Sequence, residues 1–309
     1  MRGIISRFAP APTGFLHLGH VINAAYVWQE TRARAGRVLL RIEDHDRQRS
    51  RRVYEDAILE DLAWLGFDAD EPPVRQSERN AIYESALDGL RRRGLVFACN
   101  CSRSEIAANS AGLKPCATAG EKPESSGGPK ACPEPENSVV AQGFSPADPE
   151  RRYPGTCAHR GLAEDPGVGL RIRLAPSVER FVDLRLGPQE QRPSEQSGDL
   201  LARDRDGNWT YQFAATVDDY VQGVTLVIRG IDLLASTGRQ IQLARLLGRD
   251  EPPAFMHHAL IMKSARGRDP GTSRQKLSKS DGDTGIRELR ARGWTPAQII
   301  DAAMAAASR

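Results

Sequence analysis

Two short motifs hold most of the side chains in this 309-residue chain that could do chemistry. The first, His17-Leu18-Gly19-His20, follows the turn sequence Ala9-Pro10-Ala11-Pro12-Thr13-Gly14. Two imidazoles on the first turn of a helix can donate hydrogen bonds to phosphate, which the helix N-terminus already attracts. Gly19 would let a nucleotide approach the backbone closely. A His-x-x-His pattern alone is weak evidence, since core packing and metal binding also produce it, but the preceding strand and turn favour a nucleotide site.

The second motif, Lys276-Leu277-Ser278-Lys279-Ser280, is a polar sequence with two lysines. Ammonium groups on a flexible loop can close over a triphosphate and stabilise the charge that develops during nucleotidyl transfer. A solvated basic loop is the competing interpretation, and the presence of the histidine motif in the same chain favours the functional one. We expect the catalytic residues to be His17, His20, Lys276 and Lys279. We expect the ATP contacts to be His17, Gly19, His20 and Lys279.

The elements that must position these motifs follow from the apolar pattern. Residues 3–8 and 37–42 are short apolar runs typical of buried parallel strands, and residues 18–35 between them have helical periodicity. Strand, helix and strand in succession predict a right-handed βαβ unit, the start of a doubly wound parallel sheet of the Rossmann type. Further strands are expected at 96–98, 169–174 and 224–229, and further helices at 52–65, 80–93, 212–217, 238–247, 286–292 and 296–307.

Composition limits the class of protein. The net charge of +3 is too small to predict a nucleic-acid partner by itself. No apolar run approaches the ~20 residues needed to cross a membrane, and the N-terminus has no apolar signal core. Five cysteines, an odd number, argue against a disulfide framework and for thiol or metal chemistry. We therefore expect a cytoplasmic protein, monomeric and without a membrane partner.

Three segments carry a resemblance to a known family: residues 8–20, Arg41-Ile42-Glu43-Asp44 and the lysine motif. Together they resemble the signature regions of class I aminoacyl-tRNA synthetases of the glutamyl type, and the resemblance covers residues 4–97 and 170–283. It implies a ligase that converts glutamate and magnesium-bound ATP into glutamyl-adenylate and then transfers the glutamyl group to RNA. In that reaction His17, His20 and Lys279 would stabilise charge, and no protein nucleophile is required.

The resemblance also implies a pocket for glutamate. A substrate with two carboxylates and an ammonium needs cations and an acidic group around it. Arg7 and Arg229 each end an apolar strand, and Glu43 follows the second strand, where it would face the α-ammonium. Ala11 stands where the family usually has a serine, so one hydroxyl contact is lost. The implied glutamate-binding residues are Arg7, Ala9, Ala11, Glu43, Tyr211 and Arg229.

Only twenty-nine residues follow Ser280, whereas an ordinary glutamyl-tRNA synthetase continues into a large anticodon-binding region. The chain therefore resembles the shorter branch of this family, the glutamyl-queuosine tRNA(Asp) synthetases. That branch activates L-glutamate without needing tRNA and attaches it to the queuosine base at the wobble position of tRNA(Asp). The expected partners are thus ATP, L-glutamate and queuosine-containing tRNA(Asp).

A pair of cysteine motifs resembles the zinc site of the same branch: Cys99-x-Cys101, and Tyr153-x-x-x-Cys157. Structural zinc takes four tetrahedral ligands and prefers thiolates. Because tyrosine is an unusual ligand, His159 and Cys116 stay open as alternatives to it. We expect Cys116 and Cys132, which lie in a composition-biased stretch, to be non-ligands. The expected zinc ligands are Cys99, Cys101, Tyr153 and Cys157.

These observations predict an α/β protein of four parts. Residues 1–95 would form the first half of the Rossmann-type catalytic domain, and residues 169–234 the second half. Residues 96–168 would be a zinc-bearing insertion with a disordered stretch near 109–152, which is rich in Pro, Gly and Ser and lacks periodicity. Residues 235–309 would be a small, mainly helical part that carries the lysine motif.

Three other functions stay open at this point. One is a truncated conventional glutamyl-tRNA(Glu) synthetase, and another is a nucleotidyltransferase that makes the adenylate of a different acid. The third, a non-catalytic RNA-binding paralogue, is disfavoured by the intact histidines and lysines. Asp218-Asp219 could be read as catalytic carboxylates, but we favour a structural role at the end of a helix, with one aspartate shaping the pocket.

Overall fold

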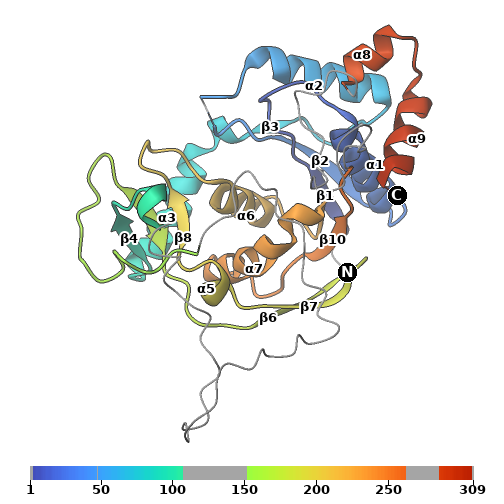
Figure 1. The fold of residues 1–309 in the computed structure, drawn as a ribbon. Helices are drawn as coiled ribbons and strands as arrows, with labels where there is room; N and C mark the ends of the chain where they lie inside the picture. Colours follow the sequence, from blue (N-terminus) through green and yellow to red (C-terminus); the bar gives the residue numbers. More distant parts are fainter. Residues whose placement is uncertain (1–2, 47, 107–151, 262–284, 308–309) are drawn as a thin grey trace, which may run out of the picture.

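The computed structural model describes residues 3–46, 48–106, 152–261 and 285–307 (Figure 1). One sheet has the strand order β1-β2-β3 and is parallel throughout. A second has the order β7-β6-β10-β9, in which β6, β10 and β9 are parallel and the edge strand β7 is antiparallel. The strands are β1 (Ile5–Phe8), β2 (Arg37–Ile42), β3 (Val74–Arg75), β6 (Glu179–Asp183), β7 (Gly187–Gln191), β9 (Leu226–Gly230) and β10 (Ala254–His258).

The two sheets adjoin along β1 and β9. The Thr225 backbone N–H donates to the Ile5 carbonyl oxygen over 2.8 Å, and the Ile5 N–H donates to Thr225 Oγ1 over 2.9 Å. The chain runs from β1 outward to β2 and β3, whereas the strands on the other side of β1 are β9 and then β10, which come later in the chain. The strand order therefore reverses between β1 and β9, which is the position where open α/β sheets bind their ligands. The predicted α/β class with a parallel sheet is confirmed.

Helices cover both faces of this sheet. On one face α1 (Leu18–Arg32) contributes buried small and branched residues such as Ala25 and Val27, and it shares a core with α2 (Arg52–Leu65), α8 (Ile286–Ala291) and α9 (Pro296–Ala307). On the other face Ile241 of α7 (Thr237–Leu246) packs with Val227 and Phe255 of the sheet. The expected helices at 52–65 and 296–307 are confirmed, but the expectation of a mainly helical part after residue 234 missed β10, which is central in the sheet.

A third, antiparallel sheet has the order β4-β5-β8. It shares one core with α3 (Asn80–Arg92) and α6 (Tyr211–Val221), where Tyr83, Leu87 and Phe213 are fully buried. Strand β4 lies within residues 96–168, which the sequence predicts to be an insertion, and β5 begins directly after them. Because β4 and β5 pair, the two parts contribute to one sheet. The strands are β4 (Val96–Cys99), β5 (Gly169–Ile172) and β8 (Leu200–Arg203), and the remaining short elements are η1 (Gln76–Glu78), α5 (Pro193–Gln196) and η2 (Ile231–Ser236).

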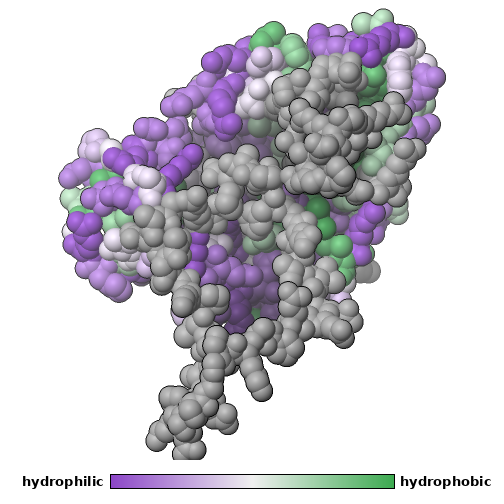
Figure 2. Space-filling view, viewed as in Figure 1, coloured by the Kyte–Doolittle hydropathy of each residue, from purple (hydrophilic) through white to green (hydrophobic). Residues whose placement is uncertain are grey.

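The outer surface is mostly polar. Figure 2 shows hydrophilic residues over most of the visible described surface, with apolar residues in small patches. Among the described helices, none has the length and apolar character of a membrane span. The stretch near 109–152 that we expect to be disordered lies, except for residue 152, outside the described residues.

Asp218 on α6 ties the antiparallel part to the parallel sheet. Its carboxylate is fully buried and accepts hydrogen bonds from Gln76 Nε2 (2.8 Å), Arg79 Nε (2.7 Å) and the Tyr83 hydroxyl (2.8 Å). Arg41 Nε of β2 lies 3.7 Å from the same carboxylate. A buried carboxylate is tolerated only when its lone pairs and charge are satisfied in this way. The favoured structural role of the Asp218-Asp219 pair is therefore confirmed for Asp218.

Replacing this carboxylate should destabilise the fold. We expect Asp218→Ala to lower the free energy of unfolding by about 3–5 kcal/mol, because it leaves buried cations without their partner. Urea unfolding followed by circular dichroism measures the change. The matched control is Asp206→Ala, an exposed turn residue, which should change the stability by less than about 0.5 kcal/mol. Equal stability of Asp218→Ala and the control would contradict this role.

Candidate functional site

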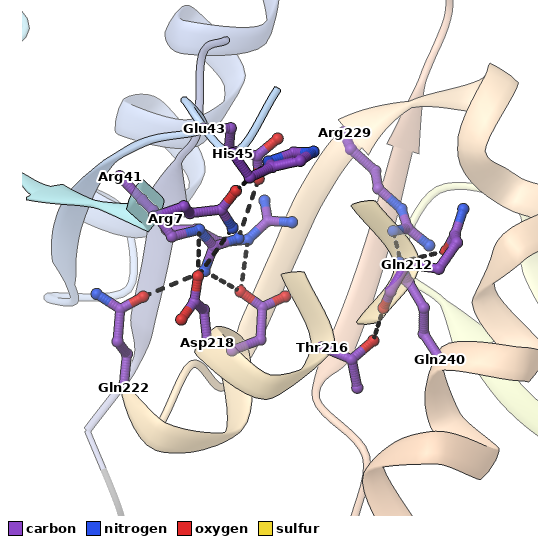
Figure 3. Close-up of polar contacts among 12 residues, drawn as sticks. Arg7, Arg41, Glu43, His45, Gln212, Thr216, Asp218, Gln222, Arg229 and Gln240 are labelled. Carbon is purple, nitrogen blue, oxygen red and sulfur yellow. Dashed lines mark hydrogen bonds and ion pairs between the residues drawn. The ribbon is translucent and has the colours of Figure 1, made fainter. Parts of the chain in front are cut away.

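Four charged residues meet at the carboxyl ends of β1 and β2. Arg7 Nε of β1 lies 3.1 Å from Asp219 Oδ1, and Arg41 Nη1 of β2 lies 2.8 Å from the same oxygen. Arg41 Nη2 also lies 3.4 Å from Glu43 Oε1, just beyond the end of β2. Figure 3 shows Arg7, Arg41 and Glu43 grouped in this way above Gln222, which accepts a further bond from Arg41. Two guanidinium groups and two carboxylates thus form one cluster, and Asp218 lies beside it, 3.7 Å from Arg41 Nε.

Burial affects the two carboxylates of this cluster differently. Desolvation disfavours the charged form of Asp219, but Arg7 and Arg41 outweigh it and hold the pKa of Asp219 below its usual value. Burial raises the pKa of Glu43, and the guanidinium of Arg41 offsets this only in part. Asp219 therefore acts as the fixed counter-ion of the arginines. Glu43 is a carboxylate whose charge a cationic ligand would stabilise further.

Arg229 of β9 lies toward the other end of α6, beside Gln212 and Gln240 in Figure 3. Its side chain is buried, and it donates to Gln240 Oε1 (2.6 Å), Thr237 Oγ1 (2.8 Å) and His257 Nε2 (3.0 Å). All three acceptors are neutral, and among the described residues no carboxylate lies within ion-pair distance of Arg229. Burial accordingly lowers the pKa of Arg229. A buried guanidinium without a carboxylate partner is suited to take one from a ligand.

Tyr211 lies between the two groups, on the first turn of α6. Burial raises the pKa of its hydroxyl, and the carboxylate of Glu43 raises it further, while Arg229 and Arg7 lower it. The structure therefore brings together four residues predicted from the sequence: Arg7, Glu43, Tyr211 and Arg229. The Glu43 N–H donates to the carbonyl oxygen of Pro10 over 3.0 Å, which places the turn that contains Ala9 and Ala11 beside the same cluster.

The two histidines occupy the N-terminus of α1, as expected. His17 is the N-cap residue, and its Nδ1 accepts from the Gly19 N–H over 3.0 Å, while His20 Nδ1 accepts from the His17 N–H over 3.1 Å. A neutral imidazole that accepts at Nδ1 carries its proton on Nε2, so each ring is set as a donor there. A Cβ on Gly19 would come within 2.8 Å of the His17 ring, which explains the glycine.

Lys276 and Lys279 lie outside the described residues. The chain is described again from Gly285, which forms a β-bridge with His17, and the Ile286 N–H donates to the Leu16 carbonyl oxygen over 3.0 Å. The start of α8 is thus held against the N-terminus of α1.

A separate cluster lies beyond β4, where Cys99, Cys101 and Cys157 have their sulfur atoms within 4.8 Å of one another. The Tyr153 hydroxyl is 3.6 Å from Cys99 Sγ and accepts from the Cys157 N–H over 2.8 Å. Burial raises the pKa of Cys101 to about 12, whereas for Cys157 hydrogen bonds overcome the effect of burial and lower the pKa to about 7. Three thiols at this spacing could hold a metal ion. His159 is exposed and is not part of the cluster.

The sequence did not reveal several residues that surround Arg229 or pair with Arg7. Gln240, Thr237 and His257 surround Arg229, yet none belongs to a recognisable motif. Arg41 belongs to the motif Arg41-Ile42-Glu43-Asp44, and Asp219 belongs to the pair Asp218-Asp219. For these two residues the sequence therefore gave an indication. Their role as a buried ion pair depends on contacts between residues 178 apart in the chain.

The fold and this site define the catalytic domain of a class I aminoacyl-tRNA synthetase, which is a ligase. Residues 3–127 and 159–305 match the family of class I tRNA synthetases (E and Q), catalytic domain, and the chain belongs to this family. It is 40% identical over 278 residues to the glutamyl-Q tRNA(Asp) synthetase of Bordetella bronchiseptica. This match covers 90% of this chain and 75% of the relative. The glutamyl-Q tRNA(Asp) synthetase of Burkholderia cenocepacia is 36% identical to this chain, and the match covers 99% of this chain and 95% of that protein.

A solved structure agrees with this placement. The glutamate tRNA ligase of Elizabethkingia meningosepticum, solved in complex with its amino acid, superposes with a TM-score of 0.65 at 26% identity. The match covers 91% of this chain and 53% of that ligase.

The raised pKa of Glu43 predicts a pH-dependent effect on stability. Its folded-state pKa lies above the ordinary value of 4.5, so ionisation favours the unfolded chain as the pH rises through the folded-state pKa. We expect Glu43→Gln to be more stable than the wild type at pH 8, with the advantage fading as the pH falls towards 4.5. Urea midpoints at several pH values test this. The exposed Glu71→Gln is the control, and equal midpoints for Glu43→Gln and wild type at every pH would contradict the assignment.

Proposed function

We propose that the protein activates L-glutamate with ATP, without tRNA, and transfers the glutamyl group to the queuosine base at the wobble position of tRNA(Asp). The observation that carries the glutamate part is Arg229, a buried cation whose described partners are all neutral. The RNA part is supported by the two relatives named glutamyl-Q tRNA(Asp) synthetase. The match over 95% of the Burkholderia protein's length supports the same branch.

The pocket fits glutamate group by group. Arg229, with Tyr211 beside it, would bind one carboxylate, and Arg7 would attract the other. Glu43, which gains from a cationic partner, would bind the α-ammonium. Ala9 and Ala11 would contact the substrate through the backbone of their turn. This assignment uses the two cations and the one acidic group that a substrate with two carboxylates and one ammonium requires.

Activation would occur at the N-terminus of α1. The glutamate α-carboxylate attacks the α-phosphorus of ATP, which enters with Mg²⁺, and the bond to the leaving pyrophosphate breaks. The Nε2–H groups of His17 and His20 are directed donors that can stabilise the negative charge, and Gly19 allows the phosphates to approach the helix end. Lys276 and Lys279 would add positive charge. A hydroxyl of the modified base then attacks the adenylate carbonyl, which releases AMP.

We further propose that the cysteine cluster binds a structural zinc ion, with Tyr153 as the fourth ligand. The donor set fits, since three thiols converge and the tyrosine oxygen is 3.6 Å from Cys99 Sγ. The guanidinium of Arg171 lies over the Tyr153 ring, 3.8 Å from its centroid, and packs the ring beside the thiols. Burial raises the pKa of the Tyr153 hydroxyl, so a bound metal ion would have to displace its proton. When bound, zinc would hold the end of β4 to the segment around residue 157.

The amino-acid and RNA specificities can be tested together. We expect ATP–pyrophosphate exchange with glutamate in the absence of tRNA, and no exchange with aspartate or glutamine. Labelled glutamate should then attach to tRNA(Asp) that contains queuosine and not to the same tRNA with guanosine at that position. Attachment to the 3′ end of tRNA(Glu), or a strict requirement for tRNA in the exchange, would overturn the proposal.

Arg229→Gln provides the matching variant. It removes the buried cation and should reduce exchange at low glutamate by about 100-fold or more, since a charge-assisted contact to the substrate carboxylate is lost. Arg180→Gln, a solvent-exposed arginine on β6, is the control and should exchange at the wild-type rate.

Metal content tests the zinc proposal independently of activity. Purified protein should contain one zinc per chain, and Cys99→Ala or Cys157→Ala should contain none. Tyr153→Phe should retain the metal more weakly, as measured by competition with a chelator. Cys116→Ser and Cys132→Ser are the controls and should keep full occupancy. Loss of zinc in Cys116→Ser with retention in Tyr153→Phe would exclude Tyr153 as the fourth ligand.

A further inference from the structure

A line of three polar side chains crosses the sheet beside the proposed glutamate site. Arg229 on β9 and His257 on β10 are register partners in the parallel ladder, so both side chains stand on the same face of the sheet. Asp183, at the end of β6, follows on the next strand, because β6 pairs with the other side of β10. All three are buried, with His257 and Asp183 at most 1% exposed.

The hydrogen bonds along this line determine where the imidazole proton lies. Arg229 Nε can only donate, so His257 Nε2, at 3.0 Å, accepts. His257 Nδ1 therefore carries the proton and donates it to Asp183 Oδ2 over 2.6 Å. Asp183 is itself held in place, since it accepts from the backbone N–H groups of His257, Arg185 and Leu186. The result is a continuous chain from carboxylate to imidazole to guanidinium.

We infer that Asp183 and His257 are positioning residues for glutamate recognition, and that they compensate the charge of Arg229 through the imidazole without occupying its carboxylate-binding N–H groups. This inference rests on the proposed function. A carboxylate in direct contact with Arg229 would compete with the substrate for the same donors. The imidazole removes that competition because it occupies only the Nε–H.

The donor count of Arg229 supports this arrangement. A guanidinium has five N–H groups, and His257, Gln240 and Thr237 each take one. Two remain, on the Nη atoms, for the Tyr211 hydroxyl and for a substrate carboxylate. Anchoring at Nε and at one hydrogen of each Nη fixes the plane of the guanidinium, so that the remaining donors are oriented before the substrate arrives.

The test separates glutamate recognition from general damage. His257→Leu removes the acceptor and should raise the KM for glutamate in pyrophosphate exchange by roughly 10- to 100-fold, the value of a hydrogen bond to a charged group. The KM for ATP should stay within about twofold of the wild type, because the proposed nucleotide contacts, at the N-terminus of α1, do not include the three residues of this line. His257→Gln, which can accept from Arg229 and donate to Asp183, should restore most of the glutamate affinity.

Asp183→Asn tests the same hydrogen-bond line if His257→Leu does not fold. Asp183→Asn keeps the side-chain volume but places an amide donor against either His257 or the backbone N–H groups, so it should also raise the KM for glutamate selectively. His258→Leu is the control: this buried neighbour on β10 stacks on Tyr26 and contacts Asn23, and its KM for glutamate should not change.

An unchanged KM for glutamate in folded Asp183→Asn and His257→Leu would overturn the inference. So would a parallel rise in the KM for ATP, which would indicate a merely structural role. Failure of the proposed function is distinguishable from both outcomes, because wild-type protein would then show no glutamate-dependent exchange at all.

Discussion

Arg41 lies completely buried on β2, and carboxylates from a distant part of the chain compensate its charge. Asp219 supplies the closest of these and at the same time holds Arg7 on β1. Since Asp218 and Asp219 are neighbours on α6, satisfying these buried charges fixes the helix against the carboxyl ends of both strands. The N-terminal residue of that helix, Tyr211, is thereby placed between Glu43 and Arg229. One network of ion pairs thus sets the geometry of the whole pocket.

The contrast between the buried arginines gives the site its chemistry. Arg41 and Arg7 both pair with the carboxylate of Asp219, and Arg41 also lies within ion-pair distance of Glu43. Arg229 is surrounded by a glutamine, a threonine and a neutral imidazole, which satisfy its hydrogen bonds but leave its charge for a ligand. The carboxylate of Asp183 is linked to Arg229 only through His257. Such an arrangement makes binding of an anionic substrate favourable, because the substrate completes an ion pair that the folded protein lacks.

The site lies where the strand order reverses, between β1 and β9, as expected for an open α/β sheet. The helix N-terminus with His17 and His20 comes from the first strand-to-helix crossover, and Arg229 comes from the strand on the other side of the reversal. The proposed nucleotide and glutamate sites are therefore formed by different parts of the sequence. The cysteine cluster belongs to a different core, formed with Phe97 and Ala158.

Local features of the sequence determined the first βαβ unit, the histidine motif and most of the helices, because apolar periodicity and turn residues act over a few neighbouring positions. The resemblance to the family then indicated Arg7, Glu43, Tyr211 and Arg229 as one pocket, and the structure brings these four together. The cysteine pattern likewise predicted a cluster that three sulfur atoms form. Strand β10 was missed, since Ala254–His258 is short and follows two prolines, and with it His257 went unrecognised.

Only the tertiary structure determined the electrostatic environment of each charged group. Whether a buried arginine pairs with a carboxylate or with neutral groups depends on contacts that form only on folding. Asp219, which pairs with Arg41, is 178 residues away from it in the chain. Gln240, a neutral partner of Arg229, comes from a different element, α7. The sequence shows which side chains can ionise, because that is a property of the residue. Their burial, their partners and the resulting direction of each pKa shift depend on how the strands and α6 pack, and no local pattern records that packing.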